Sequence, residues 1–255
     1  MSLKSSAPRA TFQEQVLEAL GRDICSGKIR PGQLLPPEPE LCSRFGFSRI
    51  VIREAIKSLA AKGLIEVTRR VGTLVLEPTR WNLFDPDIIA WRAQSAVFDP
   101  TLSRDLMEIR RIIEPAAVRM TALRASDEDR RNLRSAYMAM ARAVAGKGDY
   151  VKADLRFHTI ILSACGNQFV RQMQDAMAAL LRVNFDVITT KPGGPAHSLP
   201  MHEALCEAIE RGDADAAEQA VLKLISGAEE DLRELVPARA TSPRKAVSHT
   251  MPVLP

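Results

Sequence analysis

The chain has little of several features that mark particular protein classes. Aromatic residues make up 5% of its 255 residues, and its 4 cysteines are scattered without a Cys-x-x-Cys pair. Neither a disulfide framework nor a zinc knuckle is therefore expected, and the thiols should be reduced and buried. No apolar run approaches the roughly 20 residues of a membrane-spanning helix, and residues 1–10 lack a signal-peptide core. These absences predict a soluble, cytoplasmic protein.

The excess of positive over negative charge is also small, with 35 basic and 31 acidic residues. The formal net charge of +4 does not by itself indicate a nucleic-acid partner. The sequence shows no phosphate-binding loop, no cofactor fingerprint and no convincing pair of nucleophile and base, which speaks against an enzyme. Abundant alanine, leucine and arginine favour helix over sheet, and the length allows two domains with their own cores.

The most informative stretch is residues 36–76. A short first helix ends before Gly46, which can take the positive φ of a tight turn. A second helix follows Ser48, a residue suited to cap its N-terminus. Two short apolar strands come next, at residues 64–67 and 73–76. Helix, turn, helix and hairpin in this order predict a winged helix-turn-helix, and hence a DNA-binding protein.

The outward face of the second helix is basic at its N-terminal end. Arg49 and Arg53 lie one turn apart, and arginine can fork onto the O6 and N7 atoms of guanine. Ser48 and Lys57 are better placed for phosphate, which fixes register without specifying sequence. A merely solvated basic face is the alternative, but the order of elements favours DNA reading. With the basic tip of the hairpin, suited to a minor groove, the predicted DNA-binding residues are Ser48, Arg49, Arg53, Lys57, Arg69, Arg70 and Gly72.

The expected fold is mainly α, a winged helix-turn-helix domain followed by an all-α helical bundle. The predicted layout is a disordered N-terminus (1–10), the DNA-binding domain (11–77), a linker (78–100), the bundle (101–235) and a disordered tail (236–255). Within the bundle, periodicity and glycine breaks predict helices at 102–125, 127–146, 149–165, 167–190, 200–211 and 213–235.

The linker is too apolar for a free tether. Its aromatic and aliphatic residues Trp81, Phe84, Ile88 and Trp91 are expected to dock the two domains together or to line a dimer interface. Membership of the second core is the alternative.

Asp154 and His158 are four positions apart, so on a helix both project from one face. A carboxylate and an imidazole in this arrangement can hold a divalent cation, and His202 can supply a third ligand. The alternative is a hydrogen-bonded pair that binds no metal.

The chain resembles the GntR family of bacterial transcription regulators, over residues 11–235. In the DNA-binding domain the matching motifs are the Pro-Gly at 31–32, LPPEPELCSRF at 35–45, SRIVIREAIKSLAAKGLI at 48–65 and the Gly-Thr at 72–73. The resemblance implies operator contacts through Arg49, Arg53 and Arg69. Pro39 departs from the pattern, because many relatives carry arginine or lysine there.

The bundle looks like the effector-binding domain of the FadR-type subgroup. The matching stretches are EIRRIIEPAAVRM at 108–120, DLRFHTIIL at 154–162, GNQ at 166–168 and HEALCEAIERGDADAAEQA at 202–220. Many members of the subgroup bind a metal, zinc or similar, with one aspartate and three histidines. Asp154, His158 and His202 match three of these positions, and Leu224 occupies the fourth. The resemblance thus implies a shell completed by water, by the effector or by His197.

The resemblance also implies a small carboxylate effector. A hydroxy acid can chelate a hard divalent cation, and Arg110 can fork onto its carboxylate, although a pair with Glu114 one turn on is the alternative role. Asn184 and Arg182 are weaker effector-binding candidates. The linker WNLFDPDIIAW and the phrase DADAAEQA are similar to members that control sugar-acid breakdown, which suggests galactonate or a related aldonate.

These expectations combine into one hypothesis: a homodimeric repressor that binds double-stranded operator DNA and is released by the effector. Two other classes remain open at this stage. One is a helical metal-dependent hydrolase or isomerase with a DNA-binding anchor, and the other is an architectural DNA-binding protein without a ligand.

Overall fold

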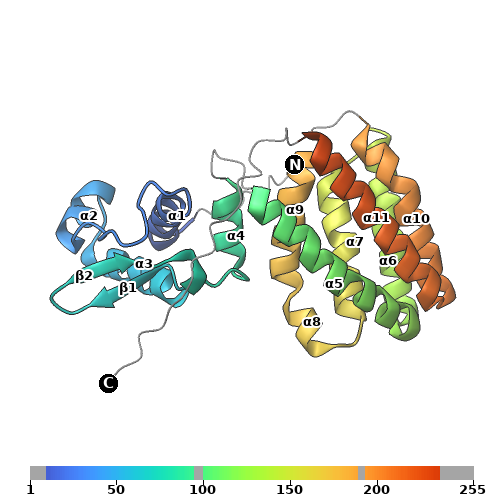
Figure 1. Ribbon diagram of the computed structural model, residues 1–255, viewed down its shortest axis with the longest axis horizontal. Coiled ribbons are helices and arrows are strands. Elements are labelled where there is room, and N and C mark those ends of the chain that lie inside the picture. Colours follow the sequence, from blue (N-terminus) through green and yellow to red (C-terminus); the bar gives the residue numbers. More distant parts are fainter. Residues whose placement is uncertain (1–9, 95–99, 189–192, 236–255) are drawn as a thin grey trace, which may run out of the picture.

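The computed structural model describes residues 10–94, 100–188 and 193–235, which form a small N-terminal domain and a larger helical bundle (Figure 1). The predicted fold class is confirmed. The ends expected to be disordered, 1–10 and 236–255, lie outside the described residues except for residue 10.

The N-terminal domain contains three helices, α1 (Phe12–Cys25), α2 (Glu38–Phe45) and α3 (Arg49–Ala61). A capping box starts α1, since the Thr11 hydroxyl accepts from the backbone of Glu14 and the Glu14 carboxylate accepts from the backbone of Thr11. Gly46 ends α2 in the left-handed region, at φ 72°, as the turn requires.

The second helix of the motif begins where the sequence predicts. Ser48 has the extended backbone of an N-cap, but its hydroxyl makes no capping hydrogen bond. The buried face of α3 packs into the domain core through Ile52, Ala55, Ile56 and Leu59.

The wing is a two-stranded antiparallel hairpin, β1 (Ile65–Thr68) and β2 (Gly72–Val75), displaced by one residue from the predicted strands. Leu34 forms an isolated bridge to Leu74 and so attaches the segment before α2 to the hairpin edge.

The predicted linker contains a 3-10 turn (Pro78–Arg80) and a helix, α4 (Pro86–Ala93). Trp81 and Trp91 are buried in the core of the N-terminal domain. On its other side α4 packs against α9 (Gln174–Ile188) of the bundle, so the linker helix contacts both domains (Figure 1). Phe84, expected to dock with the others, is 49% exposed.

The bundle is built from long helices joined by short turns. They are α5 (Pro100–Arg124), α6 (Asp127–Val144), α7 (Tyr150–Ala164), α8 (Gln168–Gln172), α9 (Gln174–Ile188), α10 (Gly194–Arg211) and α11 (Ala214–Leu235). Its core joins residues from all of the long helices, among them Val118, Met140, Phe157, Leu205 and Val221.

Two helix boundaries in the bundle differ from the prediction. The helix expected to begin at Pro200 begins at Gly194, and Pro200 lies inside it. Pro195 is the helix-starting proline, because a proline in the first turn loses no hydrogen bond. The helix predicted over 167–190 is interrupted at Met173, which separates α8 from α9.

All four cysteines are free thiols; Cys165 and Cys206 are buried, as expected, whereas Cys25 and Cys42 are only partly buried. Burial raises the pKa of the Cys206 thiol to about 12. Across the described part of the chain, no helix combines the length and the apolar character that crossing a membrane requires.

Candidate functional site

The candidate DNA-reading surface is the N-terminal end of α3. Ser48, Arg49, Arg53 and Lys57 are all exposed there, as the sequence predicts. The buried positions of α3 hold this helix against α1, so the basic residues project from a rigid element.

A carboxylate of α2 holds Arg53, one of the two arginines that are predicted to contact bases. The Nε atom of Arg53 donates to both oxygens of Glu38, at 3.0 and 2.9 Å. Since this contact engages Nε, the terminal nitrogens of Arg53 remain for a base edge. Glu38 is a positioning residue that the sequence reasoning missed, because a contact fifteen positions away leaves no helical spacing signal.

The tip of the wing places its basic residues in solvent. Arg69 and Arg70 are exposed, and the backbone of Arg70 is left-handed, at φ 68°. The Val71 amide closes the turn by donating to the Thr68 carbonyl at 3.2 Å. Gly72 has φ 121°, a conformation that a side chain rarely allows. The wing therefore presents two arginines at a sharply constrained turn.

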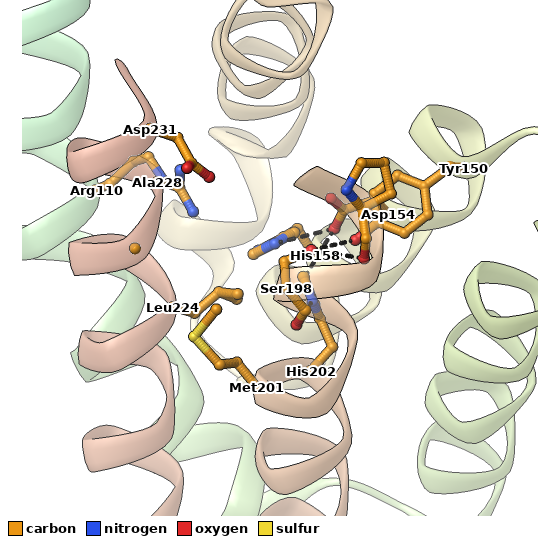
Figure 2. Close-up of a pocket in the computed structure, with 12 residues that line it drawn as sticks. Arg110, Tyr150, Asp154, His158, Ser198, Met201, His202, Leu224, Ala228 and Asp231 are labelled. Atoms are coloured by element: carbon orange, nitrogen blue, oxygen red, sulfur yellow. Dashed lines mark hydrogen bonds and ion pairs between the residues drawn. The ribbon is translucent and has the colours of Figure 1, made fainter. Parts of the chain in front are cut away.

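The second candidate site is a small pocket inside the bundle, between α5, α7, α10 and α11 (Figure 2). Its cavity has a volume of about 30 Å³, room for roughly one or two water molecules. Asp154, His158 and His202 lie on one side of it, and Arg110 and Asp231 lie on the other (Figure 2).

The structure brings the three predicted metal ligands together. The Nε2 atoms of His158 and His202 lie 3.3 and 3.1 Å from Oδ1 of Asp154, and one donor atom from each residue fits within 4.8 Å of the others. All three side chains are at least 97% buried, with exposures of 3%, 2% and 1%. Neither Asp154 Oδ1 nor His202 Nε2 makes a hydrogen bond.

Neighbouring groups orient the two imidazoles. His202 Nδ1 lies 2.9 Å from the Ser198 carbonyl, and His158 Nδ1 lies 3.5 Å from Oε2 of Glu114. Both acceptors favour a proton on Nδ1, which leaves the Nε2 lone pairs directed at the Asp154 carboxylate. Lone pairs and a carboxylate that face one another repel unless a positive charge lies between them, so this arrangement fits a cation.

The electrostatics of Asp154 lead to the same requirement. Burial raises the pKa of its carboxyl, but His202 and His158, when they carry a proton that faces it, outweigh burial and hold the pKa well below its usual range. The carboxylate is thus ionised and needs positive charge beside it, either a proton on an imidazole or a metal ion. Burial, with the charge of Asp154 second, raises the pKa of the Tyr150 hydroxyl, which keeps it neutral.

Arg110 faces the same pocket from α5. It is 1% exposed and pairs with Glu114, with Nε 2.7 Å from Oε1. The alternative role considered for Arg110, this pair one turn on, is therefore present. Its other terminal nitrogen, NH1, is buried and makes no hydrogen bond. A buried guanidinium nitrogen with an open donor beside a cavity can bind a carboxylate oxygen.

The remaining predicted residues lie as follows. Leu224 lines the pocket and is 4% exposed, at the position where many relatives have a histidine. Arg182 is exposed on α9 and is not part of the pocket lining, and His197 is exposed on α10, away from the three ligands. The side chain of Asn184 lies outside the described residues.

Sequence reasoning missed three polar residues of the pocket, Asp231 and a hydrogen-bonded pair, Tyr150 and Ser198. Tyr150 donates to or accepts from Ser198 at 2.6 Å, linking α7 to α10 beside the ligand cluster. Each residue of this pair precedes a predicted ligand, Asp154 or His202, by four positions. That helical spacing was the available signal.

Two family descriptions match the chain, one for each domain. Residues 12–75 match the bacterial regulatory proteins of the gntR family, and residues 105–227 match the FCD domain. A winged helix-turn-helix joined to such a domain defines a DNA-binding transcription regulator.

Known relatives support this class. The chain is 36% identical over 225 residues to the galactonate operon transcriptional repressor of Escherichia coli K12, covering 87% of this chain and 97% of that protein. It is 31% identical over 172 residues to the Uxu operon transcriptional regulator of the same organism, covering 66% and 64%. The chain belongs to the GntR family of transcription regulators, and the expected class, a regulator and not an enzyme, is confirmed.

A solved structure shows the same fold. It is that of Lar, which controls the expression of the Listeria monocytogenes agr system, and it matches with a TM-score of 0.66 at 19% identity, covering 90% of this chain and 100% of that one. At this identity the likeness concerns the fold alone.

Proposed function

We propose that the protein is a repressor of a sugar-acid catabolic operon, which a small hydroxy-carboxylate such as galactonate or a related aldonate releases from its operator. The relative that is 36% identical is a galactonate operon repressor, and the pocket contains groups suited to an acid. In this proposal a homodimer binds an inverted repeat, one winged helix per half-site.

The observation that carries the proposal is the convergence of Asp154, His158, His202 and Arg110 on one buried cavity. Two imidazoles and a carboxylate would hold a divalent ion such as zinc, which supplies a Lewis-acidic position for hydroxyl and carboxylate oxygens. The free donor of Arg110 would bind the same carboxylate. Leu224 leaves the protein shell one ligand short of the subgroup's usual four.

The small cavity makes a change of shape part of the proposal. A volume of about 30 Å³ is room for one or two water molecules, so in this proposal α10 or α11 moves away from α5 and α7 when a six-carbon acid binds. Both α7 and α11 pack against α9, and α9 packs against α4. This chain of contacts connects the pocket to the DNA-binding domain.

Thermal unfolding against a panel of aldonates and keto-deoxy sugar acids, before and after chelation, tests the effector and the metal together. A ligand at 100 times its dissociation constant should stabilise the protein by about 2.7 kcal/mol. A rise in unfolding temperature that disappears after chelation supports the metal-bound effector. A rise that remains after chelation leaves Arg110 as the anchor without a metal. No shift with any acid removes the sugar-acid assignment and leaves the DNA-binding regulator.

Reciprocal binding tests the regulatory part. If the effector releases DNA, saturating operator must weaken effector binding by the same factor, typically about 1–3 kcal/mol of coupling. Effector affinity that does not change with operator contradicts the release mechanism. Light scattering of the free protein gives its mass and tests the homodimer.

A further inference from the structure

Helix α3, which is proposed to read DNA, carries an apolar side chain that is exposed to solvent. Ile50 is the second residue of α3 and is 75% exposed. No other large hydrophobic residue that the structure describes exceeds this fraction, and the nearest values belong to Phe169 at 72% and Ile112 at 69%, both in the bundle. The exposed position gives Ile50 no part in the core, so folding does not explain it.

The surroundings of Ile50 are basic. Arg49 precedes it, and Arg53 lies three positions on, which places the two side chains on one surface of the helix. The Arg53 guanidinium is held there by Glu38. An exposed isoleucine between two arginines is unfavourable in water, and it would lie directly on whatever surface the arginines contact.

In the major groove of DNA, one base presents an apolar group of its own. Thymine exposes its C5-methyl there, whereas the other edges present hydrogen-bond donors and acceptors. We infer that Ile50 is a specificity-determining residue that packs against the methyl group of a thymine in each half-site. The inference rests on the proposed insertion of α3 into the major groove.

Deoxyuridine separates this contact from every other property of the base pair, because it lacks only the methyl group. The purified full-length protein would first select its preferred duplex from a random library. Each thymine of that duplex is then replaced singly by deoxyuridine, and the dissociation constant is measured by fluorescence anisotropy. The protein, Ile50→Ala and the matched control Ile112→Ala, an exposed isoleucine far from the reading helix, are compared.

One thymine per half-site should be sensitive. Loss of its methyl should weaken binding of the unaltered protein and of Ile112→Ala by about fourfold, equivalent to about 0.8 kcal/mol for one methyl-sized group. Ile50→Ala, whose single methyl group reaches less far, should show at most a small difference between the thymine and deoxyuridine duplexes. Because Ile50 is exposed, its variant should unfold at the same temperature as the parent.

The outcomes separate the two levels of the argument. If a duplex is selected but no deoxyuridine weakens binding, or if Ile50→Ala keeps the sensitivity, the thymine contact is wrong while DNA reading stands. If no duplex is enriched, the proposed function fails and the contact fails with it.

Discussion

Ile88 and Ile89 are neighbours in α4, yet they are buried in different cores. Ile88, at 0% exposure, belongs to the core of the DNA-binding domain, and Ile89, at 2%, belongs to the core of the bundle. Successive residues of a helix point about 100° apart, so a short helix can serve two cores at once. A displacement of α9 therefore acts on α4 and, through Ile88, on the domain that carries α3.

The other contacts of α4 strengthen this connection. Lys62, just after α3, lies 2.8 Å from a carboxylate oxygen of Asp85 and 2.8 Å from one of Asp87, at the start of α4. Trp91 donates its indole N–H to Glu18 of α1 at 2.6 Å. The N-terminal domain and α4 thus form one packed unit.

Gly21→Ala should destabilise the protein. A Cβ at this position of α1 would lie 2.5 Å from ring carbons of Trp91, which is only 2% exposed and has no room to retreat. Overpacking of this kind costs about 1–3 kcal/mol, more than the gain in helix propensity of up to about 1 kcal/mol. Denaturant unfolding measures the difference. In the control Gly227→Ala, also inside a helix, the new Cβ would meet only the flexible end of Met201, at 3.3 Å, so stability should stay the same or rise by up to about 1 kcal/mol. A stabilised Gly21→Ala contradicts the account.

Arg49→Ala should relax base preference at one operator position and cost about 1–3 kcal/mol of binding. Lys57→Ala, by contrast, should weaken binding to all sequences alike. It should also reduce by about one the slope of log affinity against log salt concentration, as expected for a phosphate contact. Binding to single-base variants of the selected duplex, at several salt concentrations, checks both. A uniform loss in Arg49→Ala would make Arg49 a phosphate contact instead.

Leu224→His should increase affinity for zinc. Leu224 lines the pocket that contains Asp154, His158 and His202, and a fourth ligand there would complete a tetrahedral site. Isothermal titration calorimetry with zinc, on protein from which a chelator has removed any metal, measures the gain in zinc affinity. His202→Ala should lose zinc binding. Equal zinc affinity in Leu224→His and the parent would show that position 224 cannot reach the ion.

The link between α6 and α10 should weaken in acid. The Arg134 side chain donates to Glu210, with Nε 2.8 Å from Oε1, and this hydrogen bond lowers the Glu210 pKa below its usual value of 4.5. A depressed carboxyl pKa contributes stability above the unfolded value, and this contribution is lost as pH falls below 4.5. Glu210→Gln should be less stable near neutral pH and should lose less stability on acidification. A Glu210→Gln variant that loses as much stability in acid as the parent would contradict this account.

Much of the fold is predictable because its signals are local. Gly46 marks a turn by its lack of a Cβ, and Thr11 marks a helix start by its hydroxyl, whatever surrounds them. The start of α10 was predicted wrongly at Pro200, because a proline is compatible with the first turn of a helix and, at some cost, with a helix interior. The choice was made by Pro195, five residues earlier, which fits the first turn of α10.

In the candidate site, too, some residues are predictable from local spacing and others are not. The spacing of four predicts the pair of Asp154 and His158, and His202 is a candidate third ligand from the sequence, a role that the family resemblance also implies. The contact between Glu38 and Arg53 joins two helices across a turn, and the approach of Glu114 to His158 joins α5 to α7. Such pairings depend on how helices pack, which one sequence does not reveal.

The small cavity beside Arg110, Asp154 and Leu224 also bears on the timing of the proposed effector response. With a volume of about 30 Å³, it would have to enlarge by movement of the bundle helices before the proposed sugar acid could enter, and collective motions of this kind take about microseconds to milliseconds. The rate at which such a ligand associates is then limited by helix opening and levels off at high concentration. A regulator built in this way has a maximum response rate that its own packing sets, however abundant the metabolite becomes.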